Sequence, residues 1–153
     1  MAKQSAGLLV FRERLGQLEV LLVHPGGPFW KNKDAGAWTI PKGELLPNED
    51  PLDAARRECQ EELGFEPAGS FIPLQPVKQK GGKIIQAWAV LSDWDPSRLR
   101  SNSFPLEWPP RSGKLQEFPE VDQAAYFDLP AAEIKINPAQ IPLLHELKAK
   151  LQR

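Results

Sequence analysis

The chain has 153 residues, and its 41% hydrophobic and 25% charged residues predict one globular domain over residues 1–153 rather than a disordered chain. Nineteen Lys and Arg residues against twenty Asp and Glu residues give a net charge of −1, which argues against general nucleic-acid binding. The single cysteine, Cys59, excludes a disulfide framework, and the lack of a long apolar run or a cleavable signal pattern predicts a cytoplasmic location without membrane contact.

Short apolar runs between turn-forming residues predict the sheet. The predicted strands are residues 6–11, 18–23, 77–80, 83–91 and 123–128. The first two strands flank a turn at residues 14–17 and are expected to form a hairpin. The third and fourth flank Gly81-Gly82, a pair that suits the positive φ of a tight turn, and predict a second hairpin.

Two helices and one irregular segment complete the prediction. Residues 51–63 follow Asp50, a suitable N-cap, and precede Gly64, which suits the left-handed residue just past a helix end. Residues 142–151 carry leucines at helical spacing and predict a C-terminal amphipathic helix. The proline-rich residues 92–120 predict a long irregular segment, and such segments often carry function.

Three carboxylates gather on one face of the first helix. At 100° per residue, Glu58, Glu61 and Glu62 fall within about 100° of one another, and Glu58 with Glu62 is an unfavourable like-charge pair. A divalent cation neutralises such a cluster, and Mg²⁺ is typically shared between carboxylates, water and substrate phosphates. The alternative is a solvated acidic face, stabilised by an ion pair between Arg57 and Glu61.

The run from residue 43 to residue 65 resembles a known signature. It reads Gly43, five residues, Glu49, seven residues, and then Arg57-Glu58-Cys59-Gln60-Glu61-Glu62-Leu63-Gly64-Phe65. This run resembles the Nudix box, the loop–helix–loop signature of Nudix hydrolases. Residues 6–10, 38–43 and 125–132 are also similar to parts of that family's fold. The resemblance implies an α/β (α+β) fold, a Nudix-type α/β/α sandwich around a mixed β-sheet.

The resemblance also implies a reaction and a cofactor. Family members cleave a nucleoside diphosphate linked to another moiety by attack of water on phosphorus, with Mg²⁺, or alternatively Mn²⁺, as cofactor. The implied metal ligands are the carbonyl oxygen of Gly43 and the carboxylates of Glu58, Glu61 and Glu62. Glu61 is alternatively the base that activates water, and Arg57 would orient it.

A further acidic residue is expected outside the box, because in this family the general base lies either in the box or in a distant loop. Glu117 and Glu120 precede the last predicted strand, and Glu120 is favoured as the distal base or ligand. Ordinary loop charge is the alternative for both. Glu49 would hold the loop before the helix or bind a metal through water.

Candidate substrate contacts lie on both sides of the box. Lys42 is a candidate phosphate contact, and His24 precedes a Pro-Gly-Gly loop whose backbone amides suit an anion. Trp108 and Arg111 lie in the proline-rich segment and could form a nucleotide-binding lid. The plainer alternatives are a structural histidine at a strand end for His24 and ordinary packing for Trp108.

Subfamily features leave the substrate open. Residues 81–83 are Gly-Gly-Lys where the diadenosine polyphosphate branch often carries a tyrosine, and the proline typical of the ADP-ribose branch is also absent. Residues 24–36 and 104–122 look like a bacterial branch of predicted NTP pyrophosphohydrolases. We therefore expect a Mg²⁺-dependent pyrophosphohydrolase whose substrate is a small nucleotide, either a nucleoside triphosphate or a dinucleoside polyphosphate.

Two other functions compete with this expectation. The first is a non-catalytic, nucleotide-binding Nudix regulatory module, but such modules typically lack box carboxylates that this chain keeps. The second is an RNA 5′-end pyrophosphohydrolase, against which the near-neutral charge argues mildly. The sequence leaves the oligomeric state open.

Overall fold

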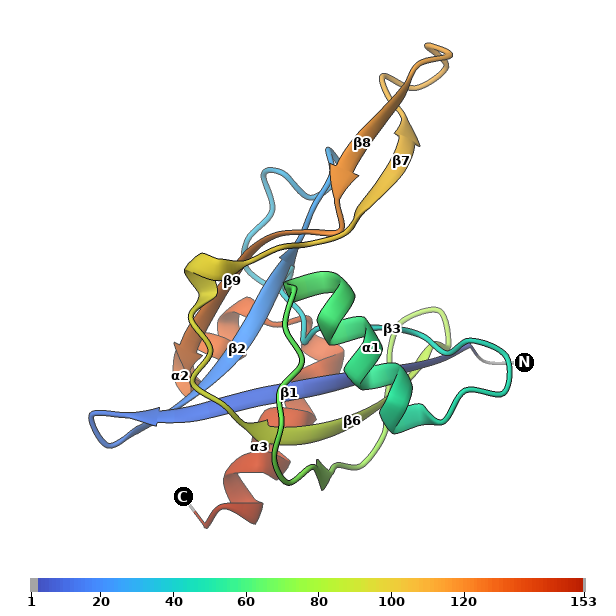
Figure 1. Cartoon of the computed structure of the whole chain (residues 1–153). Helices are drawn as coiled ribbons and strands as arrows, with labels where there is room; N and C mark the ends of the chain where they lie inside the picture. Colours follow the sequence, from blue (N-terminus) through green and yellow to red (C-terminus); the bar gives the residue numbers. More distant parts are fainter. Residues whose placement is uncertain (1–2, 153) are drawn as a thin grey trace.

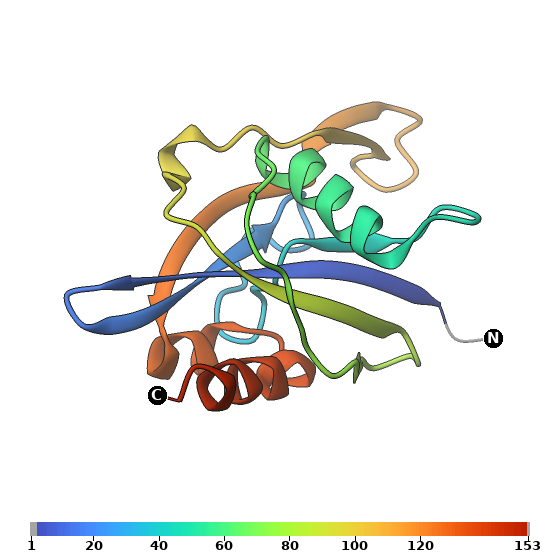
Figure 2. The same ribbon diagram turned by 60° about the horizontal axis from the view of Figure 1, so that its bottom comes forward.

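A computed structural model of the protein describes residues 3–152 as three layers. The strands are β1 (Gln4–Arg14), β2 (Gln17–Pro25), β3 (Lys42–Glu44), β4 (Ile72–Pro73), β5 (Val77–Lys78), β6 (Ile84–Leu91), β7 (Ser103–Glu107), β8 (Leu115–Pro119) and β9 (Val121–Asp128). The helices are α1 (Pro51–Leu63), α2 (Leu129–Lys135) and α3 (Ile141–Lys150), with 3₁₀ turns η1 (Pro96–Arg98) and η2 (Pro138–Gln140). Helix α1 covers one face of the main sheet, and α2 and α3 cover the other (Figures 1 and 2).

The main sheet is mixed, as the sequence predicts. Its strands run in the order β4-β6-β1-β2-β9, with β3 paired to β1 and β5 paired to β6. Strands β1 and β6 are parallel, whereas the other pairs are antiparallel. The fold is therefore the expected α/β/α sandwich, with β1 and β2 in its centre.

Both predicted hairpins are present. Strands β1 and β2 turn at Leu15 and Gly16, which both have positive φ. Strands β5 and β6 pair across Gly81 and Gly82, whose φ values of 87° and 86° explain why glycine suits this turn.

The prediction of a long irregular segment over residues 92–120 is wrong. This segment contains η1 and the hairpin of β7 and β8, which forms a separate two-stranded sheet and projects from the body of the molecule (Figure 1). Its prolines are compatible with strands because a two-stranded sheet has only edge strands, where a missing N–H is tolerated. Pro105 accordingly lies within β7, opposite Glu117 of β8.

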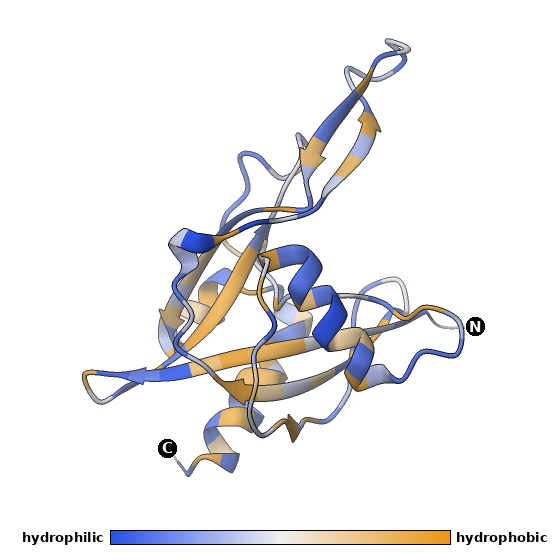
Figure 3. Ribbon diagram, in the orientation of Figure 1, coloured by the Kyte–Doolittle hydropathy of each residue, from blue (hydrophilic) through white to orange (hydrophobic). Residues whose placement is uncertain are grey.

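Apolar side chains from alternate positions of the central strands build two cores. Leu9 of β1 and Leu22 of β2 point towards α2 and α3, whereas Leu8 and Leu21 point towards α1. Figure 3 shows hydrophobic residues concentrated along these strands and hydrophilic residues on the outer side of α1. Within residues 3–152, no helix has the length and apolar character needed to span a membrane.

Candidate active site

Helix α1 is fixed at both ends by the residues that the sequence predicts. The Asp50 side chain accepts a hydrogen bond from the Asp53 N–H at 3.1 Å. At the other end, Gly64 adopts a left-handed conformation with φ 85°, and its N–H donates to the Gln60 carbonyl. The buried face of the helix presents Cys59 and Leu63 to the sheet. The three glutamates lie on a different face of the helix, and Glu58 and Glu62 on that face meet strand β3.

Arg57 is the centre of the acidic face. Its Nη1 donates to Glu58 Oε1 at 2.9 Å and to Glu61 Oε2 at 2.6 Å. Its Nε and Nη2 donate to the two oxygens of Glu49 at 2.9 and 3.0 Å, and Nη2 also reaches the Glu44 carbonyl at 3.1 Å. One guanidinium therefore ties the loop before the helix to two of the carboxylates on it.

Glu49 holds the loop before α1 in place, which is the first of the two roles predicted for it. Its Oε1 accepts a hydrogen bond from the Leu46 N–H at 3.0 Å. Hydrogen bonds from Arg57 and then from Leu46 lower the pKa of Glu49 to about 2. The loop is thus fastened by a carboxylate that stays ionised at neutral pH.

Strand β3 brings backbone against the carboxylates of α1. A Cβ atom at Gly43 would overlap the Glu58 carboxylate, so glycine lets the backbone lie against this carboxylate without displacing it. The neighbouring Lys42 N–H donates to Glu62 Oε1 at 3.3 Å. The predicted ligand position at Gly43 therefore lies directly beside Glu58.

The four carboxylates of the site influence one another. Burial raises the pKa of Glu62, and Glu58 and Glu120 add to this effect while Lys42 opposes it. Burial also raises the pKa of Glu58, and the Arg57 hydrogen bond opposes the rise. Burial, followed by the charges of Glu58 and Glu61, raises the pKa of Glu120. Glu120 therefore lies close enough to the acidic face to interact with the charges of Glu58 and Glu61. The sequence alone could only suggest this proximity.

Backbone hydrogen bonds place Glu120 next to the end of α1. The Asn102 N–H donates to the Glu61 carbonyl at 2.8 Å, and the Glu120 N–H donates to the Asn102 carbonyl at 2.8 Å. The Gly26 N–H donates to the Glu120 carbonyl at 3.0 Å from the other side. Glu117, the alternative distal acid, is exposed on β8 instead.

The donor set suits a hard cation, although the carboxylates are not arranged around a common point. Among residues 3–152, no three His, Cys, Asp or Glu side chains converge into a group that could hold a metal ion. Oxygens of Glu58 and Glu61 are instead engaged by Arg57. Carboxylate and carbonyl oxygens are nevertheless the ligands that Mg²⁺ prefers. The metal set at Gly43, Glu58, Glu61 and Glu62 remains a prediction.

Comparison with known proteins decides the family. The model of the NUDIX domain matches residues 1–147. The chain belongs to the Nudix family. Membership identifies it as a hydrolase of phosphorus-containing anhydrides, as the sequence predicts, and supports nucleotide pyrophosphohydrolase activity.

Its Nudix relatives include curated proteins from animals and bacteria. The chain is 32% identical over 108 residues to the asymmetrical bis(5′-nucleosyl)-tetraphosphatase of Rattus norvegicus, covering 62% of this chain and 69% of that protein. It is 39% identical over 65 residues to the Caenorhabditis elegans protein of the same name, covering 42% and 43%. It is 35% identical over 67 residues to the RNA pyrophosphohydrolase of Bartonella henselae, covering 41% and 36%.

Solved structures confirm the Nudix fold. A C. elegans Ap4A hydrolase in a binary complex matches with a TM-score of 0.65 and 24% identity, over 99% of this chain and 98% of that one. The Nudix domain of Shewanella oneidensis NrtR with ADP ribose matches with a TM-score of 0.67 and 15% identity, over 99% and 89%. At these identities the likeness establishes the fold alone.

Behind the Nudix box, Lys42 lines a cavity of about 130 Å³ that sequence reasoning missed. Residues of several elements line it, namely Pro25, Trp30, Gly36, Ala37, Thr39, Gln79 and Asn137. The fully buried Gln140 supports its wall by donating to Thr39 Oγ1 and to Gln79 Oε1, both at 2.7 Å. These residues come from distant parts of the chain, so no local pattern indicates them.

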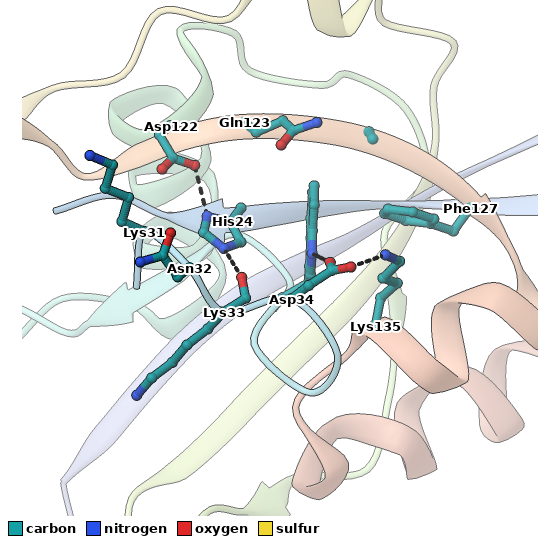
Figure 4. A pocket seen from close by; sticks show the side chains of 11 residues that line it. His24, Lys31, Asn32, Lys33, Asp34, Asp122, Gln123, Phe127 and Lys135 are labelled. Carbon is teal, nitrogen blue, oxygen red and sulfur yellow. Dashed lines mark hydrogen bonds and ion pairs between the residues drawn. The ribbon is translucent and has the colours of Figure 1, made fainter. Parts of the chain in front are cut away.

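His24 has two protein partners in this Nudix chain. Its Nδ1 lies 2.8 Å from Asp122 Oδ1 and its Nε2 lies 2.6 Å from the Lys33 carbonyl oxygen. The ring borders a cavity of about 760 Å³ on the α2 side of the sheet, which Lys135 and Phe127 also line (Figure 4). These contacts match the structural alternative for His24, and its contact with phosphate remains a prediction.

Trp108 and Arg111 lie at the end of the β7–β8 hairpin, which points away from α1 (Figure 1). Trp108 packs edge-on against Phe29, with ring centroids 5.5 Å apart. Arg111 is exposed and has a φ of 61°. The structure therefore does not bring these two residues to the acidic face, and their role in binding substrate remains a prediction.

Proposed function

We propose that this chain is a Mg²⁺-dependent nucleotide pyrophosphohydrolase that cleaves a phosphoanhydride of a dinucleoside polyphosphate or a nucleoside triphosphate. The observation that carries the proposal is the acidic face of α1. Glu58, Glu61 and Glu62 lie there close enough to Glu120 for their charges to interact, and the Gly43 backbone lies beside Glu58. Such a cluster suits a cation that in turn binds phosphates.

The relatives favour dinucleoside polyphosphates as the first substrate to test. The rat relative is named an asymmetrical bis(5′-nucleosyl)-tetraphosphatase, and the match covers more than two thirds of it. The RNA pyrophosphohydrolase relative favours an RNA 5′ end as the second candidate, although that match covers 36% of the relative.

Each carboxylate of the face has a proposed role. The Gly43 carbonyl and the carboxylates of Glu58, Glu61 and Glu62 would hold Mg²⁺, or Mn²⁺ in its place. A bound divalent cation neutralises phosphate charge and acidifies a water molecule. Arg57 positions Glu58 and Glu61 through its hydrogen bonds and does not contact substrate.

The hydrolysis itself needs a base for the attacking water. The water oxygen bonds to phosphorus, one of its protons passes to a carboxylate, and the bridging oxygen leaves with the other phosphate group. Glu61 and Glu120 are the candidates for this base. Burial and neighbouring charges raise the pKa of Glu120, which suits a group that must hold a proton during turnover.

Lys42 and the cavity beside it are proposed to receive the substrate nucleotide. The half-buried Lys42 links this cavity to the acidic face, because its N–H donates to Glu62. Trp30, which is 39% exposed, offers an aromatic surface at the same cavity. His24, Trp108 and Arg111 remain candidates for contacts farther along the substrate.

Product analysis with Mg²⁺, with Mn²⁺ and with EDTA tests the proposal. The panel contains diadenosine polyphosphates, canonical and oxidised nucleoside triphosphates, ADP-ribose, NADH, a nucleotide sugar and a 5′-triphosphorylated oligoribonucleotide. We expect metal-dependent cleavage of a dinucleoside polyphosphate or a triphosphate, with products that identify the broken bond. Cleavage of the oligoribonucleotide alone would support the RNA function. No cleavage, with Mg²⁺ still bound, would support the non-catalytic module. A cytoplasmic location also remains a sequence-based prediction.

A further inference from the structure

A third cavity, of about 610 Å³, lies at the C-terminal end of α1. It is lined by Gly64, Phe65, Trp94, Arg98 and Arg100. No ligand-binding role is predicted from the sequence for these residues, and neither the acidic face nor the cavity at Lys42 includes them. Two arginines with two aromatic rings form a surface that suits a nucleotide, because guanidinium groups bind phosphate and aromatic rings stack on bases.

The arginines are held there by the backbone that crosses the helix end. The chain leaves η1, passes the end of α1 and continues to β7 (Figure 1). The Arg100 N–H donates to the Leu63 carbonyl at 2.9 Å, and the Asn102 N–H donates to the Glu61 carbonyl at 2.8 Å. A Cβ at Gly64 would lie 2.7 Å from the Arg100 Cβ, so glycine permits this close crossing. We name residues 98–102 the crossing segment.

The side chains of Arg98 and Arg100 are available for a ligand. Both residues are exposed, and within residues 3–152 neither guanidinium forms a hydrogen bond or an ion pair with another side chain. Asp95 lies near Arg98, but its carboxylate accepts the Ser97 N–H at 2.9 Å as the cap of η1. By contrast, Arg57 on the neighbouring helix is fully engaged with carboxylates.

The aromatic pair beside them is already ordered. Phe65 and Trp94 stack with ring centroids 4.5 Å apart and an interplanar angle of 5°. Both side chains are half-buried, so part of the pair remains accessible at the cavity. A further planar group can extend such a stack at little entropic cost, because the rings are held in place by their packing.

The position of the cavity relative to the acidic face suggests which nucleotide it receives. Gly64 follows Glu61 by three residues, which is about 4.5 Å along a helix axis. The crossing segment contacts the helix at both Glu61 and Leu63. A polyphosphate chain bound at the carboxylates can therefore continue past the crossing segment towards Arg100 and Arg98, where the far end of a long substrate would lie.

We propose that this cavity binds the second nucleoside phosphate of a dinucleoside polyphosphate, while the acidic face of α1 holds the phosphoanhydride that is cleaved. The inference rests on the proposed function. It assigns substrate-binding roles to Arg98, Arg100 and Trp94, and it predicts that these residues distinguish long substrates from short ones.

The test compares kcat/KM for diadenosine tetraphosphate and for ATP in the wild type and in an Arg98→Ala/Arg100→Ala double variant. Alanine keeps the Arg100 Cβ that contacts Gly64, so the crossing segment is retained. We expect kcat/KM for diadenosine tetraphosphate to fall about tenfold, chiefly through KM, while kcat/KM for ATP stays within about twofold. An Arg14→Ala variant, which removes an exposed arginine from the β1–β2 hairpin, serves as the matched control and should change neither value.

The outcomes separate this inference from the function on which it rests. If the wild type cleaves neither substrate, the proposed function fails for both. If the wild type cleaves diadenosine tetraphosphate and the double variant cleaves it equally well, the inference is overturned and the proposed function stands. An equal loss on both substrates also overturns it. Circular dichroism melting curves of the three proteins confirm that each variant is folded.

Discussion

Arg57 contacts three carboxylates at once, so its geometry matters more than its charge. An Arg57→Lys variant keeps one positive charge but cannot bond both oxygens of Glu49 while also reaching Glu58 and Glu61. We expect kcat to fall by about 10- to 100-fold with little change in KM, because the carboxylates lose their orientation. Steady-state kinetics on the cleaved substrate measure both constants.

The adjacent Arg56 offers a matched control for this substitution. It lies on the same helix but pairs with Glu66 at 2.7 Å and lies over the Phe71 ring. An Arg56→Lys variant should retain wild-type kcat. Equal losses in the two variants would show that general helix stability, and not orientation of the acidic face, explains the effect of Arg57.

The Glu62 carboxylate is buried and is repelled by neighbouring carboxylates. Without a metal ion, its negative charge therefore lowers the free energy of unfolding. Since its pKa is raised by burial and then by Glu58 and Glu120, the folded state binds more protons than the unfolded state above the ordinary value of 4.5. Its contribution to stability therefore falls as the pH rises through that range. A Glu62→Gln variant in EDTA should melt higher than the wild type at neutral pH, with a flatter pH dependence. With Mg²⁺ present, the same variant should lose most of its activity.

Thermal melting from pH 5 to pH 8 in EDTA shows whether the contribution of Glu62 to stability falls as the pH rises. Glu117→Gln is the control, because Glu117 is an exposed carboxylate on β8 outside the acidic face. It should leave both the melting curve and the activity unchanged. A Glu62→Gln protein that melts lower than the wild type at neutral pH would mean that its carboxylate stabilises the metal-free fold.

At the scale of elements, Gly64 allows the crossing segment to pack closely against the end of α1. Gly64→Ala adds a Cβ at a φ of 85° and places it 2.7 Å from the Arg100 Cβ. Gly16→Ala has a similar φ of 77° but meets nothing within 4 Å. We expect Gly16→Ala to cost about 1 kcal/mol of unfolding free energy from backbone strain, and Gly64→Ala to cost about 1–3 kcal/mol more. Chemical denaturation measures the difference, and equal costs would contradict a close crossing.

The same elements show what sequence could predict. The caps of α1 and the turns at Gly16 and Gly81 depend on a few neighbouring residues, and they were predicted correctly. The hairpin of β7 and β8 was missed because prolines usually argue against strands, and only the pairing of two edge strands makes them acceptable. Local chemistry therefore predicted the elements with strong local signals and failed where pairing decides.

At the scale of the whole molecule, the site is assembled from segments far apart in the chain. The sequence placed the helical carboxylates on one face because the helical repeat alone requires it. It could not place Gln140 beside Thr39 and Gln79, because those contacts span 101 and 61 residues. For Glu120 it offered only a preference over Glu117, and the hydrogen bonds through Asn102 are what bring Glu120 to the end of α1.

This assembly leads to a prediction about metal binding and global stability. A cation bound only by the folded state stabilises it by about 2.7 kcal/mol at a hundred times its Kd. For a chain of this size we expect Mg²⁺ to raise the melting temperature by about 5–10 °C, and EDTA to reverse the change. Calorimetry at several Mg²⁺ concentrations gives the shift and its dependence on concentration.

Variants of the two distal acids then show how far the cation site extends. In Glu120→Gln, we expect a smaller Mg²⁺-dependent shift, because this carboxylate lies in the same field as Glu58 and Glu61. In Glu117→Gln, the shift should match the wild type, since that side chain is exposed on β8. An undiminished shift in Glu120→Gln would confine the cation to α1 and β3, and Glu120 would then keep only its role as a candidate base. The absence of any shift in the wild type would contradict a metal-binding role for the acidic face.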